Sequence, residues 1–88
     1  MASYKVIFKP SVVKDLRSLP RSVVTRIFKH IDALKDDPFP RQSIKLAGAE
    51  QLYRVRIGDY RLIYGVDKNN RQVIVHYVRH RRDVYRRL

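Results

Sequence analysis

The segment Leu52–Tyr64, with the sequence LYRVRIGDYRLIY, restricts the fold of this chain more than any other. Apolar residues alternate with arginines before Gly58 and Asp59 and again directly after them, which is typical of two strands joined by a two-residue turn. Such a turn fixes four cross-strand pairs: Ile57 with Tyr60, Arg56 with Arg61, Val55 with Leu62, and Tyr53 with Tyr64. We therefore expect an antiparallel hairpin with this register.

The two faces of this hairpin differ in chemistry. Because side chains alternate across a sheet, one face collects the apolar and aromatic residues, and Arg54, Arg56 and Arg61 project from the other. Like charges directly opposite each other cost roughly a few tenths to 1 kcal/mol per pair, and neither strand contains a carboxylate to offset this cost. The arrangement indicates an anion-binding face; the alternative is an ordinary solvated strand face.

Length and charge narrow the class of protein. A chain of 88 residues predicts one domain, residues 1–88, with a single modest core. The chain has 20 Lys and Arg against 8 Asp and Glu, a formal net charge of +12. This excess favours contact with a polyanion, because a basic surface releases the counterions condensed on nucleic acid. Charge that serves only solubility is the alternative.

Several classes of site are not expected. The chain has no cysteine, which excludes disulfides and thiolate metal sites. No carboxylate lies near a histidine at metal-ligand spacing, so we expect neither a metal nor another cofactor. Near the N-terminus only Val6, Ile7 and Phe8 form an apolar run. We therefore expect no signal peptide, no membrane contact and a cytoplasmic location.

The N-terminal half predicts a strand and two helices. Residues 4–9 alternate like a strand, which Pro10 ends, and Ser11 is expected to cap a short helix. A longer helix follows Pro20 and stops near Asp37, ahead of two further prolines. The residues expected on the apolar helix faces are Val12, Val13, Leu16 and Leu19, followed by Val24, Ile27, Phe28, Ile31 and Leu34.

The C-terminal half predicts a meander of strands. Residues 38–50 are expected to be a surface connection from which Ile44 and Leu46 enter the core. After the hairpin, the β-branched run at residues 72–78 predicts a third strand, and residues 79–88 are expected to form one or two helical turns.

The order of these elements defines the fold class. We predict an α+β two-layer domain in which an N-terminal strand and a helical hairpin pack on a mainly antiparallel sheet, completed by the three-strand meander. Two helices with one apolar stripe each cover a single face of a small sheet. The opposite face, which carries the arginines, is therefore expected to be open.

Three stretches together resemble the RelE/ParE superfamily of toxins: Lys45–Gly48, Tyr53–Tyr64 and Val78–Tyr85. The resemblance covers essentially the whole chain, and the chain is most similar to the RelE branch, which cleaves messenger RNA in the ribosomal A site. It implies a single RelE-like domain acting as the toxin of a type II toxin–antitoxin system. The implied activity is metal-independent endoribonuclease activity that inhibits translation.

The same resemblance assigns catalytic roles to Arg54, Arg56, Arg61, Arg81 and Tyr85. Arg61 would stabilise charge on the reacting phosphorus, and Arg54 and Arg56 would anchor phosphates. Arg81 would stabilise the leaving oxygen, and Tyr85 would stack on a base or accept the hydroxyl proton. The best-known RelE has lysines where this chain has Arg54 and Arg56. A base role at these two positions is not expected, because a guanidinium keeps its proton.

Substrate binding and partners complete the expectations. The residues expected to bind substrate are Arg54, Arg56, His80 and Arg82, and His80 is also a candidate base. The implied partners are the ribosome, its message and a RelB-like antitoxin. We expect an acidic, partly disordered antitoxin, in a higher-order complex that binds DNA through the antitoxin. Two alternatives stay open, a ParE-like DNA gyrase inhibitor and a non-catalytic nucleic-acid-binding module.

Overall fold

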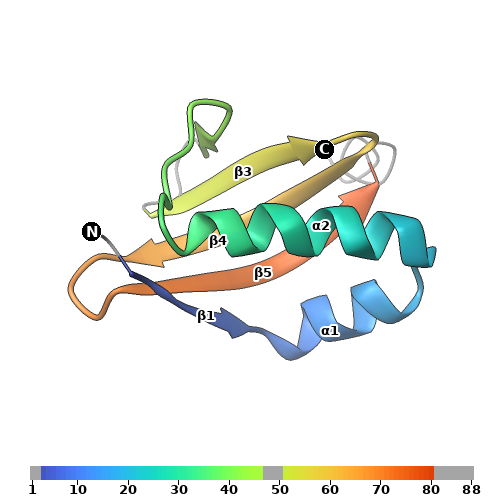
Figure 1. Ribbon diagram of the computed structural model, residues 1–88. Helices are drawn as coiled ribbons and strands as arrows, with labels where there is room; N and C mark the ends of the chain where they lie inside the picture. Colours follow the sequence, from blue (N-terminus) through green and yellow to red (C-terminus); the bar gives the residue numbers. More distant parts are fainter. Residues whose placement is uncertain (1–2, 47–50, 81–88) are drawn as a thin grey trace.

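The computed structural model describes residues 3–46 and 51–80, and these residues form two helices and five strands. In chain order the elements are β1 (Lys5–Phe8), α1 (Pro10–Arg17), α2 (Arg21–Leu34), β2 (Ile44–Lys45), β3 (Leu52–Ile57), β4 (Tyr60–Asp67) and β5 (Gln72–His80). The strand order is β1-β5-β4-β3-β2, with β1 parallel to β5 and the other pairs antiparallel. Figure 1 shows α2 lying across one face of this sheet. The predicted α+β two-layer fold, with its three-strand meander, is confirmed.

The β3–β4 hairpin has the register that the sequence predicted. Tyr60 lies opposite Ile57, and Arg61 lies opposite Arg56. Gly58 takes a φ of 61°, whereas Asp59 does not take a positive φ. Positive φ at the first central residue alone is the pattern of a type II′ turn, which glycine adopts without steric cost and which matches the twist of the flanking strands. The turn therefore holds the register of the whole hairpin.

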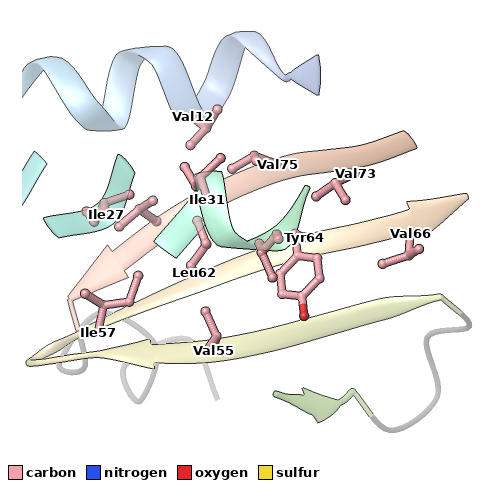
Figure 2. Close-up of a cluster of buried hydrophobic side chains, with 12 residues drawn as sticks. Val12, Ile27, Ile31, Val55, Ile57, Leu62, Tyr64, Val66, Val73 and Val75 are labelled. Atoms are coloured by element: carbon pink, nitrogen blue, oxygen red, sulfur yellow. The ribbon is translucent and has the colours of Figure 1, made fainter. Parts of the chain in front are cut away.

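The core lies between the helices and the sheet (Figure 2). The buried residues of this core are Val12, Ile27, Ile31, Leu34, Val55, Ile57, Leu62, Tyr64, Val66, Val73, Val75 and Val78. The expectation for two helical residues was wrong, since Val13 is 40% and Phe28 is 44% exposed. The contact between α2 and the sheet is narrower than the apolar stripe, and the Phe28 ring packs instead on Phe8 at the flank, with ring centroids 5.9 Å apart.

Helix α1 completes the hydrogen bonding of one edge of β5. The parallel partner β1 pairs only with residues 72–75 of β5. Beyond that point the Ser11 hydroxyl donates to the His76 carbonyl at 2.7 Å, and the Val78 N–H donates to Asp15 Oδ2 at 3.2 Å. Ser11 is therefore not the N-cap that we expected. Lys9 takes that position, and Pro10 opens the helix, where its missing N–H costs nothing.

Two segments differ from the sequence prediction. The connection after α2 contains the short strand β2, which extends the sheet beyond β3, and Ile44 within it is 53% exposed rather than in the core. Strand β5 continues to His80, so the expected helical turns do not include Arg79 or His80. The remainder of the segment for which helical turns were expected lies outside the described residues. Within the described part of the chain, neither helix is long and apolar enough to cross a membrane.

The hydroxyl of Tyr64 provides a test of the core. It donates to the Pro38 carbonyl at 2.9 Å, and both residues are buried. Tyr64→Phe leaves that carbonyl without this donor, so we expect the free energy of unfolding to fall by about 1–3 kcal/mol. Denaturant unfolding measures the change. Tyr77→Phe, at a half-buried position of β5, is the matched control, and equal losses in the two variants would contradict the prediction.

The imidazole of His76 in β5 predicts that the stability of the protein depends on pH. Burial lowers the pKa of His76 below its ordinary value of 6.5, and the Lys9 ammonium lowers it further. The unfolded chain then binds more protons at this residue than the folded chain, so the free energy of unfolding falls as the pH falls through about 6.5. Thermal melts should show His76→Gln to be less sensitive than the parent protein between about pH 7.5 and pH 5. An unchanged pH dependence in that variant would sink the idea.

Candidate functional site

Three arginines meet in one cavity on the sheet face that points away from the helices. Arg54 and Arg56 from β3 and Arg61 from β4 line a cavity of about 140 Å³, together with Gln42 and Ile44 from the segment that forms β2. We call this cavity the arginine pocket. The alternation of the hairpin predicted that the three arginines lie together. Gln42 and Ile44 were missed, because Gln42 lies in a turn and the two-residue strand β2 is too short to show a period.

The arginine pocket is strongly cationic, since no carboxylate lines it. Arg56 is exposed and lies directly opposite Arg61, which is half-buried, as is Arg54. The Arg56 Nε–H donates to the Gly58 carbonyl at 3.3 Å, which ties its side chain to the turn. Partly buried like charges repel more strongly than charges in open water, because the local dielectric is lower. A bound anion would relieve this repulsion.

Another arginine lies at the tip of the hairpin and was not singled out in the sequence. Arg26 of α2 packs its guanidinium against the turn, and a Cβ atom built on Gly58 would lie 3.3 Å from both Nη1 and Nη2. The helical stripe predicted only the buried side of α2, so no pattern pointed to this contact. The tip of the hairpin therefore carries positive charge on the helix side as well.

Arg79 continues the row of arginines into β5 but is neutralised. It pairs with Arg61 across β4 and β5. Its guanidinium forms a salt bridge to Asp15 of α1 and lies over the Tyr77 ring, 4.8 Å from the ring centroid. The structure gives it a partner within the chain, and that partner links β5 to α1.

His80 is not brought to the arginine pocket. The β4–β5 register shifts between Ile63 and Tyr64, so that His76 has no partner position and the residues after it change face. His80 therefore pairs with Tyr60, whose side chain packs on the core side, and their rings meet edge to face at 5.2 Å. The bulge thus separates His80 from the arginine pocket, and its expected role in substrate binding stays a prediction. Arg81, Arg82 and Tyr85 lie outside the described residues.

The arginine pocket can bind a phosphate and stabilise negative charge that develops on it. Guanidinium groups form charge-assisted, often bidentate hydrogen bonds to phosphate oxygens. Fixed cations in a partly water-excluded site stabilise a charged transition state more than they would in open solvent. Among the described residues that line the pocket, the ionisable groups are all guanidiniums, which do not accept a proton at neutral pH.

Comparison with known proteins identifies the class. Residues 6–85 match the family described as ParE toxin of type II toxin–antitoxin system, parDE. The protein is thus a toxin of the type II toxin–antitoxin class. Since the match covers nearly the whole chain, the protein belongs to this family, within the RelE/ParE superfamily.

Named relatives place it near RelE. Toxin RelE3 of Methanocaldococcus jannaschii is 32% identical over 87 residues, which cover 92% of this chain and 94% of RelE3. The archaeal RelE–RelB complex from Pyrococcus horikoshii OT3 contains a chain that is 37% identical, with a TM-score of 0.81, covering 92% of this chain and 97% of that one. A chain of the intact E. coli RelBE toxin–antitoxin complex is 26% identical, with a TM-score of 0.77. The match covers 86% of this chain and 94% of that one.

Repulsion in the arginine pocket can be measured through stability. Arg56→Gln removes one of two opposed charges, so at low ionic strength the free energy of unfolding should stay the same or rise by up to roughly 1 kcal/mol. Inorganic phosphate should raise the melting temperature of the parent protein, because it binds the folded state, and should raise that of Arg56→Gln less. Arg17→Gln, at an exposed arginine of α1, is the control and should keep the full phosphate response. A destabilised Arg56→Gln with an undiminished phosphate response would refute this account.

Proposed function

We propose that this toxin is a ribosome-dependent endoribonuclease that cleaves messenger RNA in the A site and so inhibits translation. One observation carries the proposal: Arg54, Arg56 and Arg61 line a single cavity in a chain whose relatives include RelE toxins. RNA supplies its own nucleophile, the 2′-hydroxyl. Attack on the adjacent phosphorus forms a 2′,3′-cyclic phosphate and expels the 5′-oxygen of the next nucleotide, and positioned cations suffice to stabilise that transition state.

The roles divide by position. Arg61, half-buried in the pocket wall, would stabilise the charge on the non-bridging phosphate oxygens, while Arg54 and Arg56 hold the phosphates. By the resemblance to RelE, Arg81 would stabilise the leaving oxygen and Arg82 would contact the substrate. Tyr85 would stack on a base or accept the 2′-hydroxyl proton. His80 is not assigned a base role here, because its ring packs on Tyr60 on the other side of the sheet.

The chemistry of the pocket supports the proposed dependence on the ribosome. A site of guanidiniums stabilises charge but does not itself remove the 2′-hydroxyl proton. Fixing the message in an in-line geometry can contribute several kcal/mol toward the barrier. The translating ribosome would provide that alignment, so we expect A-site message to be cut far faster than naked RNA.

The proposed partner is a RelB-like antitoxin. Support comes from the related structures, in which RelE chains are seen in complex with RelB. A net charge of +12 favours an acidic partner, because complementary charge speeds association and selects against other partners. We propose that the antitoxin covers the arginine side of the sheet, and that the complex is of higher order and binds DNA through the antitoxin.

A second function is favoured by the name of the matching family. The matching family is described as ParE toxin, and toxins of the ParE branch inhibit DNA gyrase. Mapping the 5′ ends of cellular messages after induction separates the two functions. Cuts in phase with codons support the ribonuclease, whereas DNA breaks with intact messages support gyrase inhibition. Toxicity without either result would favour a non-catalytic nucleic-acid-binding module.

Arg61→Ala tests the proposed chemistry. Removing one preorganised donor from a charged transition state typically costs about 10²- to 10³-fold in rate, so we expect a loss of that order in cleavage of A-site message by purified toxin on programmed ribosomes. Growth arrest on induction should disappear in parallel. Arg17→Ala on α1 is the charge-matched control and should remain toxic. Full activity in Arg61→Ala, with intact folding, would disprove the assignment.

A further inference from the structure

A second cavity lies at the other side of the ladder formed by β2 and β3. It has a volume of about 350 Å³, within the range of sites that take small organic groups. Its aromatic wall is formed by Phe39, from the loop after α2, and Tyr53 of β3. We call it the aromatic cavity. None of the roles described above uses it.

The aromatic wall is held rigidly. The Phe39 and Tyr53 rings meet edge to face at 5.1 Å, and Tyr53 stacks on the buried Tyr64 at 5.8 Å. Tyr64 is itself fixed by its hydrogen bond to the Pro38 carbonyl, and the Phe39 N–H donates to Asp37 Oδ1 at 3.1 Å. A ring platform fixed in this way loses little conformational freedom when a ligand stacks on it.

Cations and amides surround the rings. The Lys68 ammonium lies over the Phe39 ring, 5.1 Å from its centroid, so a base that stacks on this face would take its place and leave the ammonium beside the base. Lys45 adds a second ammonium, and Gln51 and Asn69 add amides that can both donate and accept hydrogen bonds. The one carboxylate of the lining, Asp67, accepts hydrogen bonds from Asn70 at the turn.

The register of β2 and β3 connects the two cavities. Ile44 pairs with Arg54, and both line the arginine pocket; the next pair, Lys45 with Tyr53, lines the aromatic cavity. Successive residues of a strand point to opposite faces, so the two cavities lie on opposite sides of the same short ladder. Strand β2 is the edge of the described sheet. The two cavities therefore flank the same edge of the described sheet.

We propose that the aromatic cavity binds an unstacked nucleobase of RNA, with Phe39 as the stacking surface and with Lys45 and Lys68 on the flanking phosphates. Stacking on fixed aromatic rings beside a cationic groove is the usual way in which proteins hold single-stranded nucleic acid. The inference rests on the proposed function for its ligand class. The base belongs either to the message or to ribosomal RNA, since the same chemistry recognises both.

The experiment measures binding by Arg61→Ala toxin, so that cleavage and toxicity do not intervene. The probes are a fluorescein-labelled adenosine decamer of RNA and an abasic decamer of equal charge, followed by fluorescence anisotropy. Phe39→Leu should weaken binding of the adenosine decamer by roughly fivefold to a hundredfold and leave the abasic decamer unaffected. Lys68→Gln should weaken binding of both and lower the salt slope by roughly 0.7.

Matched controls come from the groove beside α2. Phe28 is 44% exposed, and Lys35 is exposed on the same helix flank, so Phe28→Leu and Lys35→Gln repeat the two changes away from the aromatic cavity. Both should keep the affinity of Arg61→Ala toxin for the two decamers. Because Lys68 is exposed, its replacement does not disturb the core and keeps the test valid if Phe39→Leu folds poorly.

Ribosome binding then identifies the source of the base. Weaker binding of Phe39→Leu to vacant ribosomes assigns it to ribosomal RNA, and weaker binding only to programmed ribosomes assigns it to the message; both results support the proposal. Unchanged decamer affinity in Phe39→Leu and Lys68→Gln overturns it. The proposal is also overturned if Phe39→Leu weakens binding of the antitoxin but leaves the RNA affinity unchanged. That result would assign the aromatic cavity to a protein segment. No step of the assay requires cleavage, so an absence of ribonuclease activity leaves the result interpretable.

Discussion

The opposition of Arg56 and Arg61 across β3 and β4 is the constraint on which the site depends. A slip of one residue in this hairpin would turn the arginines into the core. The apolar face opposes such a slip, because burying a side chain such as Val55 or Leu62 contributes about 1.5–3 kcal/mol, whereas the opposed charges cost up to about 1 kcal/mol. The core therefore holds two like charges together, and the site is prepared for an anion before any anion arrives.

The surrounding elements decide how far this positive charge extends. Arg79 lies in register with Arg61, yet its charge is taken up by Asp15, which also accepts the Val78 N–H. The same carboxylate thus bonds to the open edge of β5 and neutralises the arginine that continues the row beyond β4. At the tip of the hairpin, Arg26 packs on Gly58 instead. The positive charge on this face of the sheet is therefore concentrated on β3 and β4, next to the β2 edge, rather than spread over the whole sheet.

The parts of the fold that could be predicted are those set by local patterns. The Gly58 turn and the alternation around it determined the register, and the i, i+3, i+4 spacing identified Ile27, Ile31 and Leu34 as buried. Strand β2 gave no such signal, because two residues between prolines and glycine are too few to show a period. Phe28 is apolar but lies at the flank of α2, where only tertiary contacts decide burial.

For the site, the alternation predicted the grouping of the arginines but not the place of His80. Regular alternation from the buried Val73 would put His80 on the arginine face. The extra residue at His76 reverses the faces of everything after it in β5, and a bulge of this kind depends on the partner strand rather than on the local sequence. The aromatic cavity was missed because Tyr53 was assigned to the core and Phe39 fell within the expected surface connection of residues 38–50.

The chemistry of the arginine pocket limits what this chain can contribute to RNA cleavage. Guanidiniums bind phosphate and stabilise its developing charge, but they do not take up a proton. General acid–base catalysis typically contributes about 10²- to 10⁴-fold, and the described pocket contains no group to supply the base part of it. Under the proposed function, a toxin built in this way would cut RNA slowly unless the ribosome aligns the message.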